Sequence, residues 1–404
     1  MRCLIYDGED DRYSRPGVWR FTWRILRNHN DQTVSLHYAY RVKSARAIRF
    51  FTIFSISIVA LSAISWVGLG RITAAIPKSD VFGSLKDRPK KASSAVNYLI
   101  VGSDTREGLS RAETKRLRVG TTKVAAGKRS DTMLLVHISK KRDKAAIISI
   151  PRDSFAFIPP HTSINTGNAI AGSYSKINSA YNWGGAPLLI QTFEEMSGLR
   201  IDHYVEINFV GFVRMVDALG GVEICTKRDI DDPKSHLVLP AGRHVLDGID
   251  SLKYVRTRTF DGMGDLGRMK RQQEFAGAML RKATSAGVIL NPIKLIDFVN
   301  SALASVTTDT GLSQGDLLTL AKQLRNLSAS NVRTLTIPLK FYNYNKNGVT
   351  ASVLWDPVLA PELFEKIKND KALVEYASPD SSTPPKPVDK FDTKTAADNP
   401  CLSE

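Results

Sequence analysis

The sequence has few of the residues that build zinc sites and disulfide frameworks. Its 404 residues include three cysteines, Cys3, Cys225 and Cys401, with no CxxC pair and no cysteine–histidine spacing typical of a metal site. This scarcity argues against a structural zinc site and against a small cysteine-stapled domain. If the larger part of the chain lies outside the cytoplasm, Cys225 and Cys401 could pair, but their spacing does not decide the matter.

The common catalytic signatures are missing as well. The sequence contains no HExxH, no GxSxG, no GxxxxGK[ST], and no GxGxxG after an apolar run. These absences argue against a zinc protease, an α/β-hydrolase, a P-loop nucleotidase and a dinucleotide-dependent enzyme. The seven histidines are scattered, and we expect His137, which lies inside an apolar run, to be structural.

Acidic residues are outnumbered by basic ones. The chain holds 56 Lys and Arg against 40 Asp and Glu, which gives a net charge of +16. This excess predicts an anionic partner such as nucleic acid, a lipid surface or a phosphorylated substrate. A composition of 43% hydrophobic and 24% charged residues is typical of a folded protein, and it excludes both a wholly disordered chain and a polytopic membrane protein.

One apolar run stands out from that average composition. Residues 50–70 carry no charge and are bordered by Arg49 and Arg71, and at about 1.5 Å per residue they are long enough to cross a bilayer core of roughly 30 Å. Basic residues are denser before the run than after it, which predicts a cytoplasmic N-terminus. We therefore expect a single-pass protein of the cell membrane with an extracytoplasmic main domain; a cleaved signal peptide is the alternative.

The remaining sequence predicts five segments. These are a cytoplasmic basic tail (1–49), a transmembrane helix (50–70), a linker (71–95), a folded domain (96–376) and a disordered tail (377–404). In the domain, β-branched runs at 97–102, 132–139, 145–150, 204–209, 221–225 and 332–337 alternate with helical patterns at 187–196, 209–219, 248–256, 268–283, 292–303, 314–326 and 357–368. This order predicts a layered α/β/α domain with a central mixed sheet, preceded by one transmembrane helix.

Arginine and aspartate recur together where predicted strands begin or end. The segments 102–106, 129–132 and 151–154 each contain one such pair, and the densest set follows in YVRTRTFDGMGDLGRMKRQQEF, residues 254–275. Ligands of α/β sheets collect at strand ends. A single pair is often only a salt bridge, whereas several together predict a shared site.

A phosphate or pyrophosphate group fits this concentration of arginines. The guanidinium is a planar, permanently charged fork that matches phosphate oxygens. Arg256 and Arg258 flank one threonine, so extended backbone would put them on the same side. Arg268 and Gln272 would share one helix face, and Asp265 would cap that helix or interact with its dipole. Two more carboxylates, Asp104 and Asp131, suit Mg²⁺, which binds a few carboxylates together with phosphate oxygens.

The order and spacing of these motifs resemble the LytR-CpsA-Psr family, and an actinobacterial-like member of it, over residues 97–339. The matching stretches include NYLIVGSDTREG, RSDTMLLVHI, IISIPRDS, KINSAYNWGG and GDLGRMKRQQEF. The resemblance implies a Mg²⁺-dependent, membrane-anchored phosphotransferase. It would attach a glycopolymer carried on polyprenyl pyrophosphate to peptidoglycan through a phosphodiester bond. The polymer would be of arabinogalactan, teichoic acid or capsule type.

The resemblance also assigns individual residues. It implies that Asp104 and Asp131 bind the metal, that Arg106, Arg152, Arg256, Arg258, Arg268 and Gln272 bind pyrophosphate, and that Arg152, Asp265, Arg256 and Arg258 take part in catalysis. This chain departs from the family pattern in a long basic insertion between Asp104 and Asp131, and in Ala156, where some members have arginine. The general base stays open among Asp104, Asp131 and Asp265.

The expected partners are the lipid-linked glycan, peptidoglycan and the cell membrane, with no nucleic acid. The apolar helices at 187–196 and 209–219 either line a slot for the prenyl chain or belong to the core. Two other functions compete with transfer: hydrolysis of polyprenyl pyrophosphate, and a non-catalytic role in envelope lipid binding or regulation.

Overall fold

The computed structural model describes residues 21–22, 37–38, 77–104, 110–117, 130–259, 261–285, 306–312, 316, 327–376 and 387–398. The chain divides into two units, residues 1–71 and 72–404. In the first unit, β1 (Phe21–Thr22) pairs antiparallel with β2 (His37–Tyr38). The predicted transmembrane helix at 50–70 lies outside the described residues. Among the residues that are described, no helix has both the length and the apolar character needed to cross a membrane.

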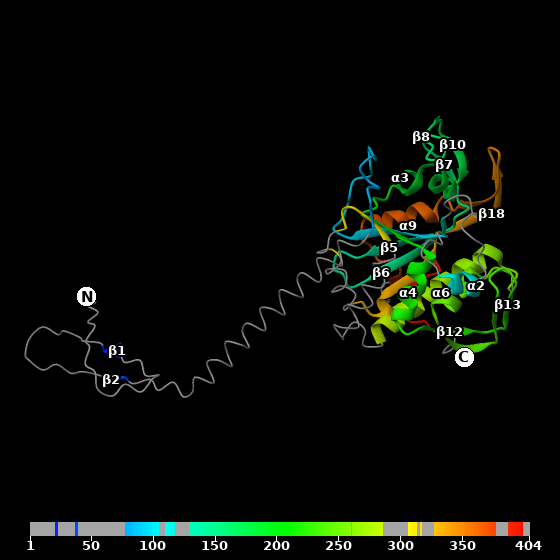
Figure 1. The fold of residues 1–404 in the computed structure, drawn as a ribbon. Helices are drawn as coiled ribbons and strands as arrows, with labels where there is room; N and C mark the ends of the chain where they lie inside the picture. The colour runs from blue at the N-terminus through cyan, green and yellow to red at the C-terminus, as the bar shows by residue number, and fades with distance from the viewer. Residues whose placement is uncertain are drawn as a thin grey trace, which may run out of the picture. The chain divides into compact units, whose positions relative to one another are not determined.

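A mixed sheet of eight strands forms the centre of the second unit (Figure 1). Its order is β22 (Lys394–Thr395), β17 (Val332–Thr336), β6 (Ala145–Ile150), β5 (Ser130–Ile138), β4 (Val96–Ser103), β11 (His203–Ile207), β16 (Val306–Asp309) and β3 (Lys78–Ser79). The pairs β4–β11, β6–β17 and β16–β3 are parallel, and the other neighbours are antiparallel. The prediction of a central mixed sheet is confirmed.

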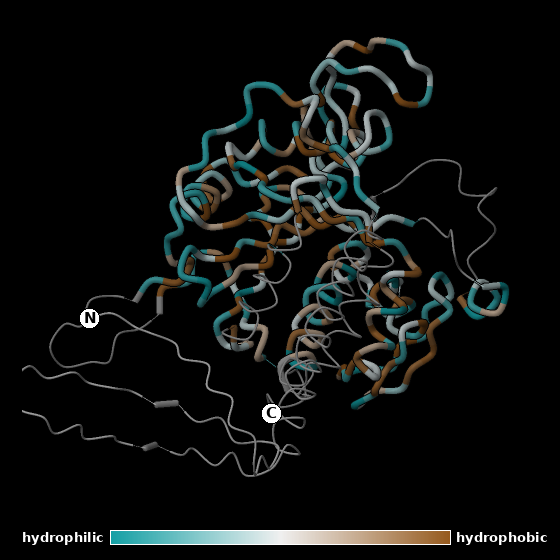
Figure 2. The backbone as a smooth tube through the Cα atoms, turned by 60° about the vertical axis from the view of Figure 1, so that its left-hand side comes forward, coloured by the Kyte–Doolittle hydropathy of each residue, from teal (hydrophilic) through white to brown (hydrophobic). Residues whose placement is uncertain are grey.

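Helices cover both faces of this sheet. Figure 1 shows α3 (Ile177–Ser197) and α9 (Leu359–Lys368) on one side of β5 and β6, with α4 (Phe209–Ala218) and α6 (Gly264–Ser285) on the other. One hydrophobic core joins α3 and α9 to the sheet, and a second joins α4, α6 and α5 (Gly248–Arg256). Hydrophobic stretches accordingly run through the middle of the domain (Figure 2). The short α2 (Arg111–Leu117) packs against α5.

Small hairpins extend from these layers. They are β7–β10 (Phe155–Ile158 and Ser173–Lys176), β8–β9 (His161–Thr162 and Ala169–Ile170), β12–β15 (Val222–Thr226 and Gly242–Leu246), β13–β14 (Ile230–Asp232 and Leu237–Leu239), β18–β19 (Leu339–Lys346 and Val349–Trp355) and β20–β21 (Glu375–Tyr376 and Pro387–Val388). A 3-10 turn, η2 (Ala329–Asn331), precedes β17. The predicted strand at 221–225 is therefore the hairpin strand β12, outside the central sheet. Cys225 on β12 is disulfide-bonded, and Cys401 lies outside the described residues.

The linker and the disordered tail were predicted over too many residues. Val81 is fully buried in the core of α3 and α9, and Arg88 Nη2 lies 2.7 Å from Glu194 Oε1 of α3. In the tail, β22 pairs with β17, and Phe391 and Ala396 are buried. A few apolar residues in otherwise polar stretches suffice to fold residues 77–95 and 387–398 onto the domain. The prediction of a linker and of disorder is wrong for these residues.

Candidate active site

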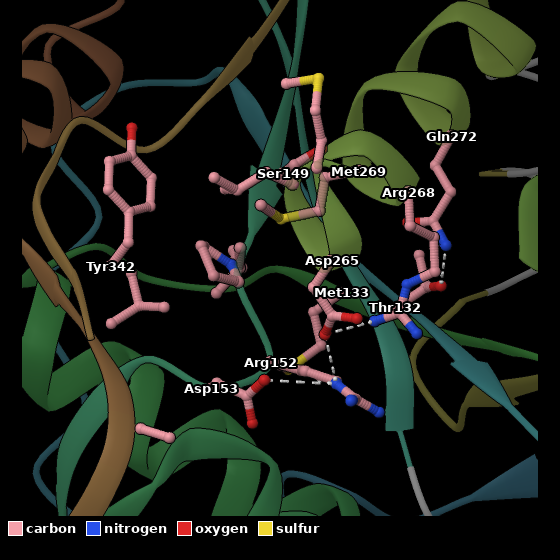
Figure 3. A pocket seen from close by; sticks show the side chains of 16 residues that line it. Thr132, Met133, Ser149, Arg152, Asp153, Asp265, Arg268, Met269, Gln272 and Tyr342 are labelled. Atoms are coloured by element: carbon pink, nitrogen blue, oxygen red, sulfur yellow. Dashed lines mark hydrogen bonds and ion pairs between the residues drawn. The ribbon is translucent and has the colours of Figure 1, made fainter. Parts of the chain in front are cut away.

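Three arginines from different elements meet at one carboxylate, Asp265. Asp265 Oδ2 accepts hydrogen bonds from Arg152 Nε at 3.0 Å and from Arg268 Nη2 at 3.1 Å, and Arg258 Nε lies 3.5 Å from Oδ1. Arg152 follows β6, Arg258 follows α5, and Asp265 and Arg268 share the first turns of α6. Figure 3 shows Arg152 and Arg268 directed at Asp265. The structure thus brings together four of the residues that the sequence predicted for one site.

The cluster gains a fourth cation that the sequence reasoning missed. Lys176 Nζ lies 3.2 Å from Asp153 Oδ1, and Asp153 Oδ2 is 3.5 Å from Arg152 Nε. Lys176 belongs to KINSAY, but the predicted helix began at Pro187, so nothing indicated that this lysine ends β10 beside the PRD loop. Four cationic side chains therefore surround two carboxylates. This excess of positive charge favours an anionic ligand.

A cavity of about 280 Å³ opens beside the cluster. Its polar side is formed by Arg152, Asp153, Asp265, Arg268 and Gln272, and its apolar side by Met133, Ile150, Met263, Leu266, Met269 and Val353 (Figure 3). The apolar residues of the predicted prenyl slot lie elsewhere: Phe193 of α3 and Val213 of α4 belong to the two cores, and neither lines this cavity. The cavity thus suits a ligand with a charged head and an apolar body.

Two glutamines fix α6 to the sheet under the cavity. Gln272 Nε2 donates to Thr132 Oγ1 at 2.9 Å and to the Val255 carbonyl at 3.3 Å. Gln273 Nε2 donates to Ser149 Oγ at 2.9 Å and also to the hydroxyl of β17 residue Thr336 at 2.8 Å. Gln272, predicted as a pyrophosphate ligand, lines the cavity, but its amide also joins β5 to the end of α5. Its contacts support a positioning role.

Asp232, another residue that the sequence reasoning missed, holds the turn that carries Arg258. Its Oδ2 accepts hydrogen bonds from the backbone N–H groups of Arg258 and Thr259, the latter at 2.9 Å. Burial alone raises the pKa of Asp232, but these amides and those of Ser235 and Lys234 lower it to about 2. No local sequence signal pairs a β13 residue with a turn 26 residues later.

A buried arginine holds the other side of this turn. Arg271 Nη2 donates to the Thr257 carbonyl at 2.7 Å, and Nη1 forms an ion pair with Asp261. Arg256 has different surroundings from Arg258, because it ends α5 and its guanidinium carbon lies 5.1 Å from the centre of the Phe209 ring. The prediction that Arg256 and Arg258 lie on the same side of an extended segment is therefore wrong, because Arg256 is the last residue of a helix.

The two predicted metal ligands occupy the same end of one strand pair. Asp104 directly follows β4, and Asp131 is the second residue of β5; the ladder pairs Ser103 with Ser130 after an irregularity at Gly102. Arg106 and the side chain of Asp131 lie outside what the structure describes. Two aspartates at one strand end fit the donor set of Mg²⁺, which completes its shell with phosphate oxygens and water. Among the described side chains, no group of three or more His, Cys, Asp or Glu forms a metal site.

His137, at the far end of β5, contacts Asn97 and Asp370. Its Nδ1 lies 2.8 Å from Asn97 Oδ1, and its Nε2 lies 3.2 Å from Asp370 Oδ1. Burial lowers the pKa of His137, against the opposing effect of the Asp370 carboxylate. These contacts join β4, β5 and the end of α9, which agrees with the expected structural role.

The chain is similar in sequence to proteins of bacterial cell wall synthesis. The chain is 38% identical over 273 residues to the probable cell wall biosynthesis protein LcpB of Corynebacterium glutamicum, an alignment that covers 67% of this chain and 61% of the relative. It is 34% identical over 227 residues to the polyisoprenyl-teichoic acid–peptidoglycan teichoic acid transferase TagT of Bacillus subtilis, covering 55% and 64%. The chain spans about three fifths of the length of such curated relatives.

Solved structures share the fold. A LytR-Csp2A-Psr enzyme from Actinomyces oris aligns with a TM-score of 0.55 at 21% identity, covering 72% of this chain and 96% of the other. A structure of TagT bound to LIIa-WTA aligns with a TM-score of 0.51 at 27% identity, with the same coverage. The LytR_cpsA_psr family profile matches residues 72–360, a range that includes the whole arginine–aspartate cluster. The chain belongs to the LytR_cpsA_psr family.

Proposed function

We propose that this protein transfers a glycopolymer from polyprenyl pyrophosphate to peptidoglycan and forms a phosphodiester bond. The observation that carries the proposal is the convergence of Arg152, Arg258 and Arg268 on Asp265 beside a cavity with an apolar wall. A pyrophosphate fits the cationic end, and the first isoprene units fit the methionine-lined side. The name of the relative TagT, a teichoic acid transferase acting on peptidoglycan, supports the same reaction class.

The arginines would bind and orient the pyrophosphate. A hydroxyl of peptidoglycan attacks the phosphorus that carries the sugar, the bond from that phosphorus to the bridging oxygen breaks, and polyprenyl phosphate leaves. Arg152 and Arg268 are placed to stabilise the negative charge that develops on the bridging oxygen. Asp265 and Asp153 are the carboxylates of the cavity wall that can accept the proton of the attacking hydroxyl.

Asp104 and Asp131 would hold Mg²⁺, and the bound ion would supply further positive charge to the pyrophosphate. Arg106 and Arg256 stay predicted ligands of the same group. The apolar segment 50–70 would anchor the domain at the outer face of the cell membrane, where its lipid-linked substrate resides. Arabinogalactan, teichoic acid and capsule polymers all meet the chemical requirement of a sugar 1-pyrophosphate.

The test is transfer by the full-length protein from a polyprenyl-pyrophosphate-linked glycan to soluble peptidoglycan with Mg²⁺ present. Replacing Arg152 by alanine should slow transfer roughly 10²–10³-fold, as when one preorganised charge donor is removed. Arg243 on β15 offers a matched control, because it is half exposed and 3.8 Å from Glu223. Arg243→Ala should transfer at the wild-type rate.

The products separate the competing functions. Phosphodiester-linked polymer on peptidoglycan supports transfer, whereas free glycan phosphate without linkage indicates a hydrolase. Lipid binding without turnover indicates a carrier or regulator. An Arg152→Ala protein that transfers polymer as fast as the wild type would show that the arginine cluster is not the pyrophosphate site.

A further inference from the structure

A row of aromatic rings crosses three strands outside the cavity. Phe157 contacts Tyr174 at a centroid distance of 5.3 Å, Tyr174 stacks on Phe155 at 5.1 Å, Phe155 meets Tyr344 at 5.2 Å, and Tyr344 stacks on Phe341 at 6.3 Å. We call these five residues the aromatic ladder. They come from β7, β10 and β18, which Figure 1 shows on the same side of the domain, and β19 packs against β7 and β10.

Three of the five ladder residues are exposed, and the other two, Phe155 and Tyr344, are half-buried. Phe157, Tyr174 and Phe341 are 43%, 45% and 49% exposed, and Tyr342, next to the ladder, is 58% exposed. None of the ladder residues belongs to a buried hydrophobic cluster of the described residues. A contiguous exposed apolar patch of this kind marks a binding surface, because single exposed rings are common but aligned ones are not.

Polar groups are interleaved with the rings. The β18 sequence alternates aromatics with Asn343 and Asn345, and both amide side chains belong to exposed residues. Residues 339–355 contain Lys340 and Lys346 but no aspartate or glutamate. A pyranose ring presents an apolar C–H face and hydroxyl edges, so it fits a surface that combines aromatic faces with amides. Asn345 Oδ1 accepts a hydrogen bond from the Ala351 N–H at 2.7 Å, but the hydrocarbon of a bilayer would offer no partner to its amide N–H groups or to the exposed Asn343 amide.

The ladder is joined to the cavity by backbone and side-chain contacts. The Val353 N–H donates to the Asp153 carbonyl at 2.8 Å, and Trp355 Nε1 donates to Ser154 Oγ at 2.8 Å. Tyr342 and Val353 line the cavity. On β10, Lys176 lies opposite Phe155 of β7 in the strand pair, and its Nζ is 3.2 Å from Asp153 Oδ1. A polymer lying on the rings would therefore end beside the cationic cluster.

We propose that the aromatic ladder binds the glycan strand of the acceptor, with sugar rings stacked on Tyr174 and Phe341. The proposal rests on the proposed function, because it assigns the ladder to peptidoglycan rather than to the lipid-linked donor. The arginine cluster then binds the pyrophosphate end, and the ladder delivers an acceptor hydroxyl to it. Each surface can be disabled without the other.

The test measures binding of soluble peptidoglycan glycan strands, stripped of their peptides, to the full-length protein. Tyr174→Ala and Phe341→Ala should each weaken glycan binding roughly two- to tenfold, the equivalent of one aromatic contact, and both together should weaken it more. Tyr174→Phe keeps the ring and should bind nearly as the wild type does. Val245→Ala, 65% exposed on β15, is the control for an exposed apolar residue.

Two further measurements separate the sites and the occupants. Arg152→Ala should keep glycan binding and lose binding of farnesyl pyrophosphate. If the proposed transferase function is wrong, pyrophosphate binding will be unaffected by this change, whereas if the ladder proposal is wrong, glycan binding will be unaffected by the ladder variants. In full-length protein held in phospholipid nanodiscs, added glycan should slow amide hydrogen exchange in residues 339–346. Wild-type glycan affinity in Tyr174→Ala and Phe341→Ala would overturn the proposal. So would protection of residues 339–346 by the bilayer alone with no change on adding glycan.

Discussion

Replacing Asp232 by asparagine tests how the turn carrying Arg258 is held. Asp232 is 1% exposed and accepts hydrogen bonds from the backbone amides of Lys234 at 2.8 Å, Ser235 at 3.0 Å and Thr259 at 2.9 Å, as well as from that of Arg258. These four donors favour the ionised carboxylate. Asparagine keeps one acceptor oxygen but removes the charge to which the donors are directed.

The pKa of Asp232 gives the size of the effect. Although burial acts to raise it, the backbone amides lower the pKa from 3.8 to about 2. At about 1.4 kcal/mol for each tenfold change in proton affinity, the ionised carboxylate contributes about 2 kcal/mol to the free energy of unfolding. Because the folded pKa is the lower one, this contribution is present above pH 3.8 and is lost as the pH falls through about 2.

Urea unfolding of the wild type and of Asp232→Asn between pH 2 and pH 7 measures this contribution directly. We expect the wild type to be about 2 kcal/mol more stable at pH 7, with the difference shrinking below pH 4. Asp231→Asn changes the exposed neighbour on β13 and should alter stability little. Glycopolymer transfer should fall as well, because the Arg258 turn loses its anchor. A stability difference that stays constant over the whole pH range would refute the reasoning.

Three other substitutions test the packing of α5 and α6. Burial raises the pKa of Glu274, despite nearby cations and a Tyr254 hydrogen bond, so the protonated side chain favours the folded state below pH 4.5 and this contribution is lost as the pH rises. In urea unfolding, Glu274→Gln should therefore gain stability relative to the wild type between pH 4 and pH 7, and a difference that does not change with pH would contradict this. A Cβ at Gly248 would lie 2.3 Å from the Val213 carbonyl oxygen, so Gly248→Ala should lower the free energy of unfolding by roughly 1–3 kcal/mol. An unchanged midpoint in urea unfolding would contradict this prediction. Gln272→Ala should lower transfer with a stability loss of about 1 kcal/mol, and unaltered kinetics would remove its positioning role.

Elements with a strong local pattern were predictable from the sequence. The helix predicted at 248–256 is α5 residue for residue, because Asp247 caps its first turn through the Asp250 N–H and apolar residues recur at helical spacing. The helix predicted to begin at Arg268 begins at Gly264 instead. Glycines at 262 and 264 are typical of a loop, and both have positive φ angles, but α6 already begins at Gly264. Asp265 therefore lies within the helix, one turn before Arg268, rather than in front of it.

Long-range contacts limited the prediction of the site. The local motifs gave Arg152, Arg258, Asp265 and Arg268, since each carries its charge in a recognisable stretch. Lys176 was missed because α3 begins at Ile177, well before the predicted start at Pro187, and continues through a kink at Gly185 with φ 69°. The order of strands in the sheet decides which strand ends lie side by side, and this order cannot be predicted from the apolar periodicity within each strand or helix.

Residues 387–398 close one side of the central sheet. β22 pairs with Arg333 and Thr334 of β17, and the Ala396 carbonyl accepts a hydrogen bond from Arg281 of α6 at 2.6 Å. Shortening the chain before Pro387 would leave the outward amide and carbonyl groups of β17 open to solvent. An open strand of this kind recruits a strand from another molecule, so removing these residues should promote self-association even where catalysis survives.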